Sequence, residues 1–172
     1  MMDIVTPRLR LRPARSEDLA AVHAVLSQPE ATRWWSTPPH ESPETTAVWL
    51  DSMIAGNDSG LDLLIERDGV VIGKAGFWRP PEIGYILHPD HWGQGLATEA
   101  ITAVLDRMFA LTEFDEAVAD VDPENAPSLR LLEKLGFRRT GFEAATVNVG
   151  GVWKDSVYLS LSRTDWARRS ET

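Results

Sequence analysis

A glycine-containing turn between a strand and a helix is the part of this sequence best suited to chemistry. Residues 82–100 read EIGYILHPDHWGQGLATEA, where an apolar strand ends near His88 and a helix begins at about Gly95. Glycines let a backbone approach a ligand closely, and the first N–H groups of a helix have no partner within it. With the helix dipole, this pattern predicts an anion site suited to phosphate or diphosphate, to which Thr98 can add a hydroxyl. A turn that simply requires Gly93 and Gly95 is the plainer interpretation.

A dinucleotide-binding turn is the main alternative for the same residues. Gly93-x-Gly95 lies between a strand and a helix, as in the G-x-G-x-x-G fingerprint, but Thr98 stands at the third glycine position. Acidic residues at 113–116 lie about 20 residues further on, where a ribose-binding carboxylate is expected. The preceding strands, however, are joined as hairpins, which favours an antiparallel sheet over repeated βαβ units. We therefore rank this interpretation second.

The elements around this turn predict a mixed α+β fold. Ser42 as a cap and Pro43 at the first helical position predict a helix, and Asp68-Gly69 predicts a hairpin turn. Hydrophobic periodicity supplies the other elements. The predicted strands span residues 6–13, 61–66, 70–78, 82–88, 117–121, 138–147 and 152–161. The predicted helices span residues 16–28, 43–55, 95–110 and 125–135.

Length and composition limit the class of protein. With 172 residues, of which 43% are hydrophobic and 25% charged, the chain predicts one globular domain over residues 1–172. The absence of cysteine excludes disulfides, a thiol nucleophile and cysteine metal sites. The sequence has neither a membrane-spanning apolar run nor the apolar stretch of a secretory signal. We therefore expect a cytoplasmic protein with no membrane partner.

The charge is concentrated in one part of the chain. The net charge is −9, and residues 82–133 alone carry eleven acidic residues and two basic ones, Arg107 and Arg130, which is also −9. A protein needs a basic patch to bind the phosphates of a nucleic acid, so we expect no nucleic-acid partner. A cationic substrate suits this field better, although a solvated acidic face would give the same count.

The glycine turn resembles a known signature. The segment LHPDHWGQGLA at residues 87–97 is similar to the acetyl-CoA motif of the GCN5-related N-acetyltransferase (GNAT) superfamily, usually Q/R-x-x-G-x-G/A, with Trp92 at its first position. The spelling W-G-Q-G-x-A-T-E-A resembles the ribosomal-protein N-terminal acetyltransferase (RimJ/RimL-like) branch. The opening TPRLRLRPARSEDL, the stretch from Asn125-x-x-Ser128 to LLEKLGFRRTG, and the tail GGVWKDSVYLSL agree with it, so the resemblance covers almost the whole chain.

The resemblance implies where acetyl-CoA would bind. The central sheet would be splayed between its fourth and fifth strands, and acetyl-pantetheine would lie in that gap as an added strand. The Leu87 N–H would face the thioester carbonyl, and Asn125 would hydrogen-bond the pantetheine arm. The implied cofactor-binding residues are Ile86, Leu87, His88, Trp92, Gly93, Gln94, Gly95, Leu96, Ala97, Thr98, Asn125 and Ser128.

The predicted reaction is direct attack of a primary amine on the thioester, because the chain has no cysteine to carry an acetyl group and no Ser–His–Asp pattern. The amine must lose a proton to a base, and we expect a water molecule to carry it. Glu82, at the start of the strand beside the cleft, is the first candidate for this base, and an edge-strand carboxylate is the plainer interpretation. Asp120 is the alternative, and Asp122 and His88 are weaker candidates.

The candidate acid is a serine. The tyrosine that protonates the leaving thiolate in many superfamily members corresponds here to Leu132, so the resemblance leaves that role open. Ser128, one turn earlier, matches the serine of the resembled branch and becomes the predicted donor. Because a serine hydroxyl is a weak acid, it can also act by hydrogen bonding alone. The missing tyrosine keeps open a different class, a non-catalytic acyl-CoA-binding sensor.

The acceptor is the part that the sequence defines least. Trp34 and Trp35 lie where the superfamily places its substrate-facing loop and could form one wall of an amine site with Glu82, although core packing or a dimer contact is as good an interpretation. Four other tryptophans are assigned to packing: Trp49, Trp78, Trp153 and Trp166. We predict no metal. The expected acceptor is a protein or peptide N-terminal amine, with a polyamine, amino acid or aminoglycoside as alternatives. We expect the protein to be a monomer or a homodimer.

Overall fold

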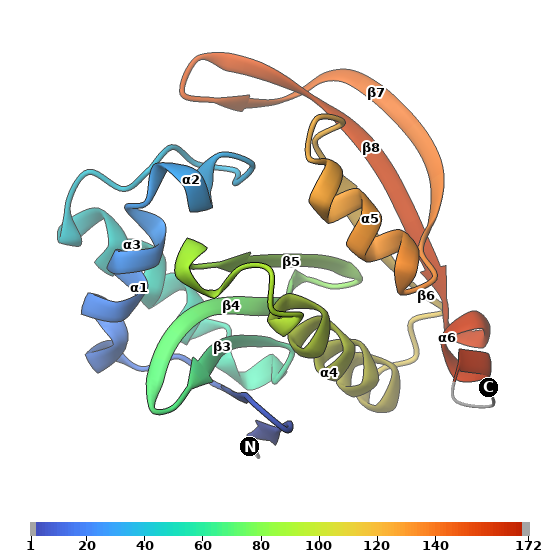
Figure 1. Ribbon diagram of the computed structural model, residues 1–172, viewed down its shortest axis with the longest axis horizontal. Helices are drawn as coiled ribbons and strands as arrows, with labels where there is room; N and C mark the ends of the chain where they lie inside the picture. The colour runs from blue at the N-terminus through green and yellow to red at the C-terminus, as the bar shows by residue number, and fades with distance from the viewer. Residues whose placement is uncertain (1–2, 170–172) are drawn as a thin grey trace.

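The computed structural model describes residues 3–169, and within them eight strands form one mixed sheet in the order β1-β2-β3-β4-β5-β6-β8-β7 (Figure 1). Neighbouring strands run antiparallel except β5 and β6, which run parallel. The strands are β1 (Ile4–Val5), β2 (Arg10–Arg12), β3 (Asp62–Arg67), β4 (Val70–Arg79), β5 (Glu82–Leu87), β6 (Glu116–Val121), β7 (Arg138–Val149) and β8 (Val152–Ser162).

The α-helices cover this sheet and connect its strands. They are α1 (Leu19–Leu26), α2 (Pro29–Thr32), α3 (Pro43–Ala55), α4 (Leu96–Leu111), α5 (Ala126–Lys134) and α6 (Arg163–Arg169). Short 3₁₀ turns lie at Ser16–Asp18, Asn57–Ser59 and Pro89–His91. None of the helices within residues 3–169 is both long and apolar enough to cross a membrane.

Local signals predicted most of these elements. The predicted helix 43–55 is confirmed as α3, because the Ser42 hydroxyl accepts a hydrogen bond from the Thr45 N–H. The predicted strand 6–13 is wrong in extent. Thr6 instead belongs to a tight turn between β1 and β2, where its N–H donates to the Leu9 carbonyl. The helices α2 and α6 were not predicted.

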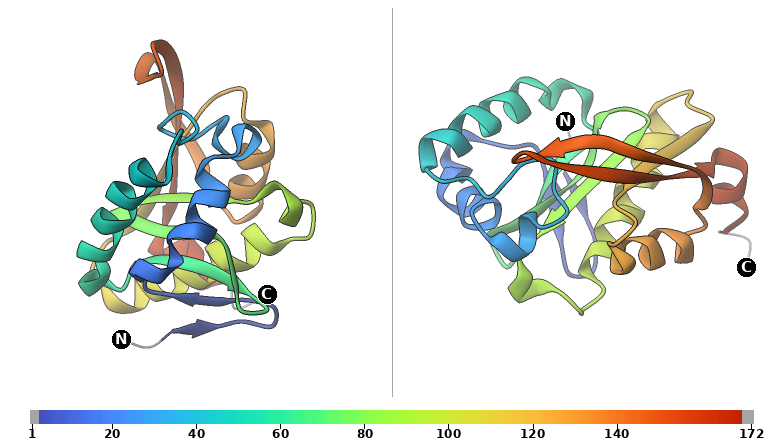
Figure 2. Two further views of the ribbon diagram at one scale, coloured as in Figure 1. Left: turned by 90° about the vertical axis from the view of Figure 1, so that its left-hand side faces the viewer. Right: turned by 90° about the horizontal axis from the view of Figure 1, so that it is seen from above.

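Two hydrophobic clusters lie on opposite faces of the sheet, because successive strand residues point to opposite sides. Leu63 and Ile65 of β3 belong to the larger cluster, with α4 and α5, whereas Leu64 belongs to the cluster under α1 and α3. Figures 1 and 2 show these two groups of helices separated by the central strands. Each face of the sheet therefore has its own core.

The sheet opens between β5 and β6. These strands pair only at Glu82 and Val118, where the Val118 N–H donates to the Pro81 carbonyl at 2.9 Å. Beyond this point the two strands share no further backbone pairs, although β5 continues to Leu87. The splay predicted between the strands at residues 82–88 and 117–121 is confirmed. The repeated βαβ units of the dinucleotide alternative are wrong, because β5 and β6 are the only parallel neighbours in the described sheet.

The β7–β8 hairpin extends beyond the body of the sheet. It arches over the molecule toward α2, and seen from above it crosses over the central strands (Figures 1 and 2). Its tip lies against the loop after α2, since a Cβ added at Gly150 would lie 3.3 Å from Pro38 Cγ. The hairpin therefore forms a roof over the space beside the open sheet.

Candidate active site

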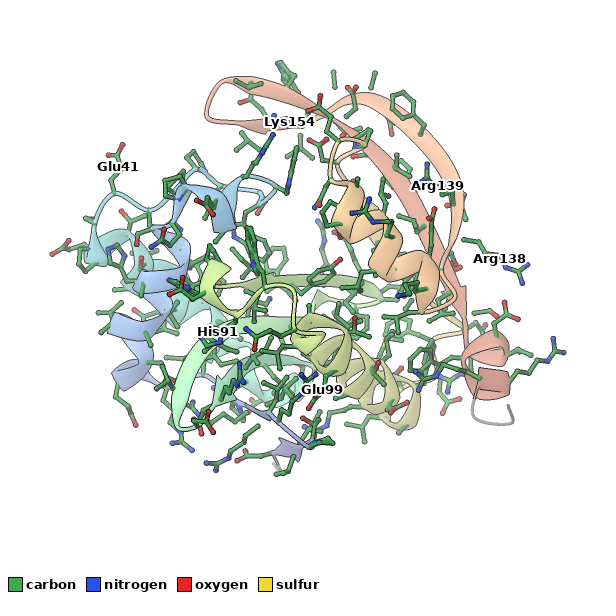
Figure 3. The ribbon with its side chains drawn as sticks, viewed as in Figure 1. Glu41, His91, Glu99, Arg138, Arg139 and Lys154 are labelled. Carbon is green, nitrogen blue, oxygen red and sulfur yellow. The ribbon has the colours of Figure 1, made fainter. Side chains whose placement is uncertain are left out.

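A cleft of about 1080 Å³ joins the open sheet to the hairpin roof. Its wall is built from β5, the glycine turn and start of α4, the end of β6, the start of α5, the hairpin and the loop after α2. In Figure 3, Lys154 lies on the part of the hairpin that spans between α2 and α5, and His91 lies on the turn before α4. Both residues line the cleft.

The glycine turn presents an uncapped helix N-terminus to this cleft. Gly93 (φ 70°) and Gly95 (φ 74°) adopt left-handed conformations that suit glycine, and no side chain caps α4 at Gly95. The first backbone hydrogen bond of the helix runs from the Glu99 N–H to the Gly95 carbonyl. The N–H groups before Glu99 are thus available to an anion, and a Cβ at Gly93 would meet nothing within 4 Å.

Side chains from distant segments hold this turn in place. Arg8 donates from Nη1 to the Gln94 carbonyl at 2.6 Å and from Nε to Glu99 Oε2 at 2.7 Å. Thr6 donates to the other Glu99 oxygen at 2.6 Å, and Arg67 donates to the Gln94 side-chain oxygen at 2.9 Å. Burial opposes ionisation of Glu99, but the bonds from Thr6 and Arg8 outweigh it and lower the pKa of this carboxyl. The turn is therefore fixed without a ligand.

Trp92, at the first motif position, ties the turn to β5. Its indole N–H donates to the Leu87 carbonyl at 2.8 Å, at the end of the strand that borders the gap. The His88 N–H donates in the opposite direction, to Ile72 of β4 at 2.8 Å. Because successive N–H groups of a strand point to opposite edges, the Leu87 N–H faces the gap.

Most of the predicted cofactor residues come together along the cleft. Two of them do not line it: the His88 ring nitrogen Nδ1 accepts from the Asp90 N–H, and the Gln94 side chain faces Arg67. Those that do line it are Ile86, Leu87, Trp92, Gly93, Gly95, Leu96, Ala97, Thr98, Asn125 and Ser128.

Of the candidate bases, Glu82 lies where β5 and β6 still pair, and Asp120 and Asp122 lie further along the gap. Glu82 is half-buried, lines the cleft and forms an ion pair with Arg79 at 3.4 Å between Nη2 and Oε2. Asp120, on β6, is exposed, and Asp122 follows the strand and accepts the Glu124 N–H at 2.9 Å. All three acids line the cleft, and Glu82 alone stands on β5.

Ser128 meets a residue that the sequence did not identify. Asn125 caps α5 by accepting the Ser128 N–H at 3.3 Å, and the Ser128 hydroxyl contacts the Tyr85 hydroxyl from β5. Leu132, by contrast, is fully buried in the core. The alternation along β5 puts Tyr85 on the same face of the sheet as Leu87, but the contact with Ser128 depends on how α5 packs against that face.

The predicted substrate side contains both aromatic and paired charged groups. Trp34 and Trp35 both line the cleft, and the Arg33 guanidinium lies 4.7 Å from the Trp34 ring centroid. Beneath them, Lys74 Nζ lies 5.9 Å from the Trp35 ring and 2.5 Å from Asp62 Oδ1. Sequence reasoning did not predict this buried ion pair, because its residues belong to strands read only as apolar.

The other tryptophans divide into two groups. Trp49 packs against the smaller cluster and Trp166 is buried, as predicted. The prediction of packing is wrong for Trp78 and Trp153, which are 67% and 61% exposed. Trp78 lies at the bulge between β4 and β5 and lines the cleft, and Trp153 stands on the β7–β8 hairpin.

The acidic stretch does not converge on the cleft. Only three of its acids line the cleft, namely Glu82, Asp120 and Asp122. Others have partners elsewhere: Glu99 with Arg8, Asp106 with Trp166, Glu116 with Ser160 and Glu133 with Arg139. No three His, Asp or Glu side chains in the described part of the chain gather as a metal-binding group.

Comparison with known families and proteins identifies the class of enzyme. The acetyltransferase (GNAT) domain model matches residues 8–138, so the chain belongs to the GNAT family of N-acetyltransferases, whose co-substrate is acetyl-CoA. The N-acetyltransferase p20 of Bacillus licheniformis is 29% identical over 177 residues, covering 97% of this chain and 99% of the relative.

Two further similarities involve proteins with stated substrates or ligands. Spermidine N(1)-acetyltransferase of Escherichia coli K12 is 25% identical over 95% of this chain and 91% of its own length. The structure of Mycobacterium smegmatis RimJ in complex with CoA-disulfide is 26% identical, with a TM-score of 0.78 over 91% of this chain and 83% of that one.

Proposed function

We propose that this N-acetyltransferase transfers the acetyl group of acetyl-CoA directly to the α-amine of a protein or peptide N-terminus. The observation that carries the proposal is the cleft itself. It continues from the gap between β5 and β6, which suits a pantetheine arm, to an aromatic wall with balanced charge, which suits a peptide. The similarity to RimJ supports the same branch of the family.

The cofactor half of the proposal rests on backbone groups. The uncapped N–H groups at the start of α4 would hold the diphosphate of acetyl-CoA, with the Thr98 hydroxyl beside them. The Leu87 N–H, which faces the gap, would donate to the thioester carbonyl as negative charge develops on its oxygen. The amide of Asn125 would hydrogen-bond the pantetheine arm, since its carbonyl oxygen already caps α5.

The proposed base is Glu82, acting through a water molecule. An α-amine titrates near pKa ~7.7–8.0 and a lysine amine near ~10.4, so at pH 7 about one α-amine in ten is neutral against fewer than about one lysine in a thousand. A carboxylate base therefore has far less to remove from an α-amine than from a lysine amine. Asp120, across the gap on β6, is the second candidate base.

The charges along the cleft are mixed rather than uniformly acidic, which is compatible with a peptide acceptor. Six acidic residues line the cleft (Glu30, Asp62, Glu82, Asp120, Asp122 and Asp155) against four basic residues (Arg33, Lys74, Arg79 and Lys154). Two of the acids are already paired, Asp62 with Lys74 and Glu82 with Arg79. The other four acids form no ion pair within residues 3–169, so the cleft also has carboxylates for a polyamine. Spermidine remains the second candidate acceptor because of the similarity to the E. coli enzyme.

The first experiment measures binding of acetyl-CoA to the purified protein by isothermal titration, with NAD as the control ligand. Acetyl-CoA should bind at one site with micromolar affinity and NAD should not bind. The next step measures release of free CoA with a thiol reagent. Its acceptors are a peptide with a free N-terminus, the same peptide blocked at its N-terminus and carrying a lysine, and spermidine.

Mass spectrometry of the products then locates the acetyl group. Acetylation of the free N-terminus alone supports the proposal, whereas faster turnover of spermidine makes the polyamine the acceptor. Binding of acetyl-CoA without release of CoA for any amine would contradict the proposed acceptor classes together. Absence of acetyl-CoA binding would contradict the proposed cofactor site.

A further inference from the structure

Two hydroxyl groups from distant segments meet beside the gap in the sheet. Tyr85 lies on β5 and Ser128 in the first turn of α5, and their side-chain oxygens are in hydrogen-bond contact. Both residues are half-buried and line the cleft, and the Tyr85 side chain packs against the larger hydrophobic cluster. Within residues 3–169, neither hydroxyl has a second hydrogen-bond partner.

The direction of this hydrogen bond follows from the two chemistries. Each hydroxyl carries one hydrogen, and a phenol is a stronger donor than an aliphatic alcohol. When Tyr85 donates, the hydrogen of Ser128 is left for a third group in the cleft. Burial raises the pKa of Tyr85 to about 12, so the phenol keeps its hydrogen throughout the neutral range.

We propose that Tyr85 orients the Ser128 hydroxyl, so that Ser128 donates a hydrogen bond to the sulfur atom of the departing CoA thiolate. The inference rests on the proposed function and adds a positioning residue to it. Leu132 has no hydroxyl, and the phenol that meets Ser128 comes instead from the facing strand. Packing against the larger cluster holds the ring of Tyr85 in place. Its hydroxyl can therefore restrain the rotation of the Ser128 hydroxyl.

The step balances without a proton leaving Tyr85. The amine nitrogen forms its bond to the carbonyl carbon, the C–S bond breaks, and the sulfur departs with the electron pair of that bond. The surplus proton of the nitrogen passes to the base, and the thiolate takes up a proton from water after release. A thiol is a stronger acid than this buried phenol, so transfer of the phenol proton to the thiolate would be unfavourable. Hydrogen bonding to the thiolate is the favourable role.

The kinetic test compares Tyr85→Phe, Ser128→Ala and the double variant. We expect Tyr85→Phe to lower kcat roughly tenfold and Ser128→Ala by at least as much, with the KM for acetyl-CoA within about twofold of wild type. The double variant should be no slower than Ser128→Ala, because Tyr85 acts only through Ser128. Tyr158→Phe is the matched control, since Tyr158 donates to Glu143 at 3.0 Å on the outer hairpin and does not line the cleft.

A second measurement does not depend on turnover. Free CoA bound to the protein is titrated, and its thiolate is followed by ultraviolet absorbance. A hydrogen bond from Ser128 should lower the pKa of the bound thiol below that of free CoA titrated in parallel, and both Tyr85→Phe and Ser128→Ala should raise it again by about one pH unit. The Tyr158→Phe protein should titrate as wild type does.

The outcomes separate this inference from the proposed function. If wild type releases no CoA with any amine, the proposed function fails, and the CoA titration still decides the inference. Equal thiol pKa values in wild type and Tyr85→Phe would overturn it, as would additive losses of kcat in the double variant. A Tyr85→Phe protein with weakened CoA affinity or lowered Tm would instead assign Tyr85 to packing alone.

Discussion

The two halves of the cleft are built in different ways. Most of the proposed cofactor half comes from one segment, residues 82–98, to which α5 adds Asn125 and Ser128, and side chains from outside the segment hold its glycine turn. The acceptor half is assembled from the loop after α2, the strands beneath it and the β7–β8 hairpin, which are far apart in the sequence. In the proposed function, acetyl-CoA would therefore be held mainly by a local motif, and the acceptor by an assembled surface.

The largest expected effect tests the local motif. Gly95→Ala places a side chain at φ 74°, where a non-glycine residue costs roughly 1–2 kcal/mol. The turn can relieve this strain only by moving the first N–H groups of α4, so we expect acetyl-CoA affinity to fall about tenfold or more in isothermal titration. Gly69→Ala, at φ 81° in the β3–β4 turn, is the matched control.

The control carries the same backbone penalty away from the cleft. Gly69→Ala should lose a similar amount of stability but keep wild-type affinity for acetyl-CoA, because nothing lies within 4 Å of its added Cβ. If both variants bind acetyl-CoA as wild type does, the left-handed turn has no part in binding. The distinction between a local cofactor motif and an assembled acceptor surface would then lose its main support.

The next effect tests the clamp. Arg8→Ala removes the donors to the Gln94 carbonyl and to Glu99, and should weaken acetyl-CoA binding roughly three- to fivefold. Stability should change by less than about 1 kcal/mol, because Arg8 is a largely exposed ion-pair partner. Arg10→Ala removes the same charge from the neighbouring strand, where Arg10 pairs with Asp3. An equal loss of affinity in both variants would indicate a general effect of charge.

A third variant tests the assembled half. Trp35→Leu shortens the wall above Lys74 while keeping an apolar side chain, and should raise the KM for the acceptor about fivefold with acetyl-CoA affinity unchanged. Trp153→Leu is the control, because Trp153 is exposed on the hairpin and does not line the cleft. Steady-state kinetics with the peptide acceptor measure both. A parallel loss of acetyl-CoA affinity in Trp35→Leu would show that the two halves are not separable.

The difference between the halves also explains what the sequence could predict. The cap at Ser42, Pro43 at the first helical position and the strand–turn–helix at residues 82–98 depend on neighbours in the chain, and they were predicted correctly. The contact of Tyr85 with Ser128 depends on which faces of β5 and α5 meet, 43 residues apart. No periodicity within either element contains that information.

Charge shows the same limit. The acidic stretch predicted a field that would attract cations, but its members lie on different faces of the helices and strands that carry them. Glu99 and Glu133 face arginines outside the stretch, and Asp106 accepts the indole N–H of Trp166. A count of charges along the chain therefore does not predict the charge of the cleft. The charged residues that line the cleft come from several segments.

The smallest expected effect concerns the attachment of the acceptor loop. His40 lies near the end of this loop and is buried. The Thr46 hydroxyl of α3 lies 2.8 Å from Nδ1 of His40 and 2.7 Å from Nδ1 of His23. Burial, reinforced by the nearby His23, lowers the pKa of His40 below its ordinary value near 6.5. The folded protein therefore favours neutral His40. Its contribution to stability is complete above about pH 6.5 and declines as the pH falls toward the lowered value.

His40→Asn should remove part of this pH dependence, because an amide can replace the Nδ1 hydrogen bond and carries no charge. Between pH 7.5 and pH 5.5, thermal unfolding should show a decrease in Tm about 1–3 °C smaller for the variant than for wild type. Acetyl-CoA affinity should be equal in both, since His40 and Thr46 lie outside the cofactor half. If the variant and wild type lose Tm in parallel, another group sets the acid sensitivity. If acetyl-CoA affinity falls with the protonation of His40, the acceptor loop and the glycine turn are coupled, and the cleft is one unit rather than two.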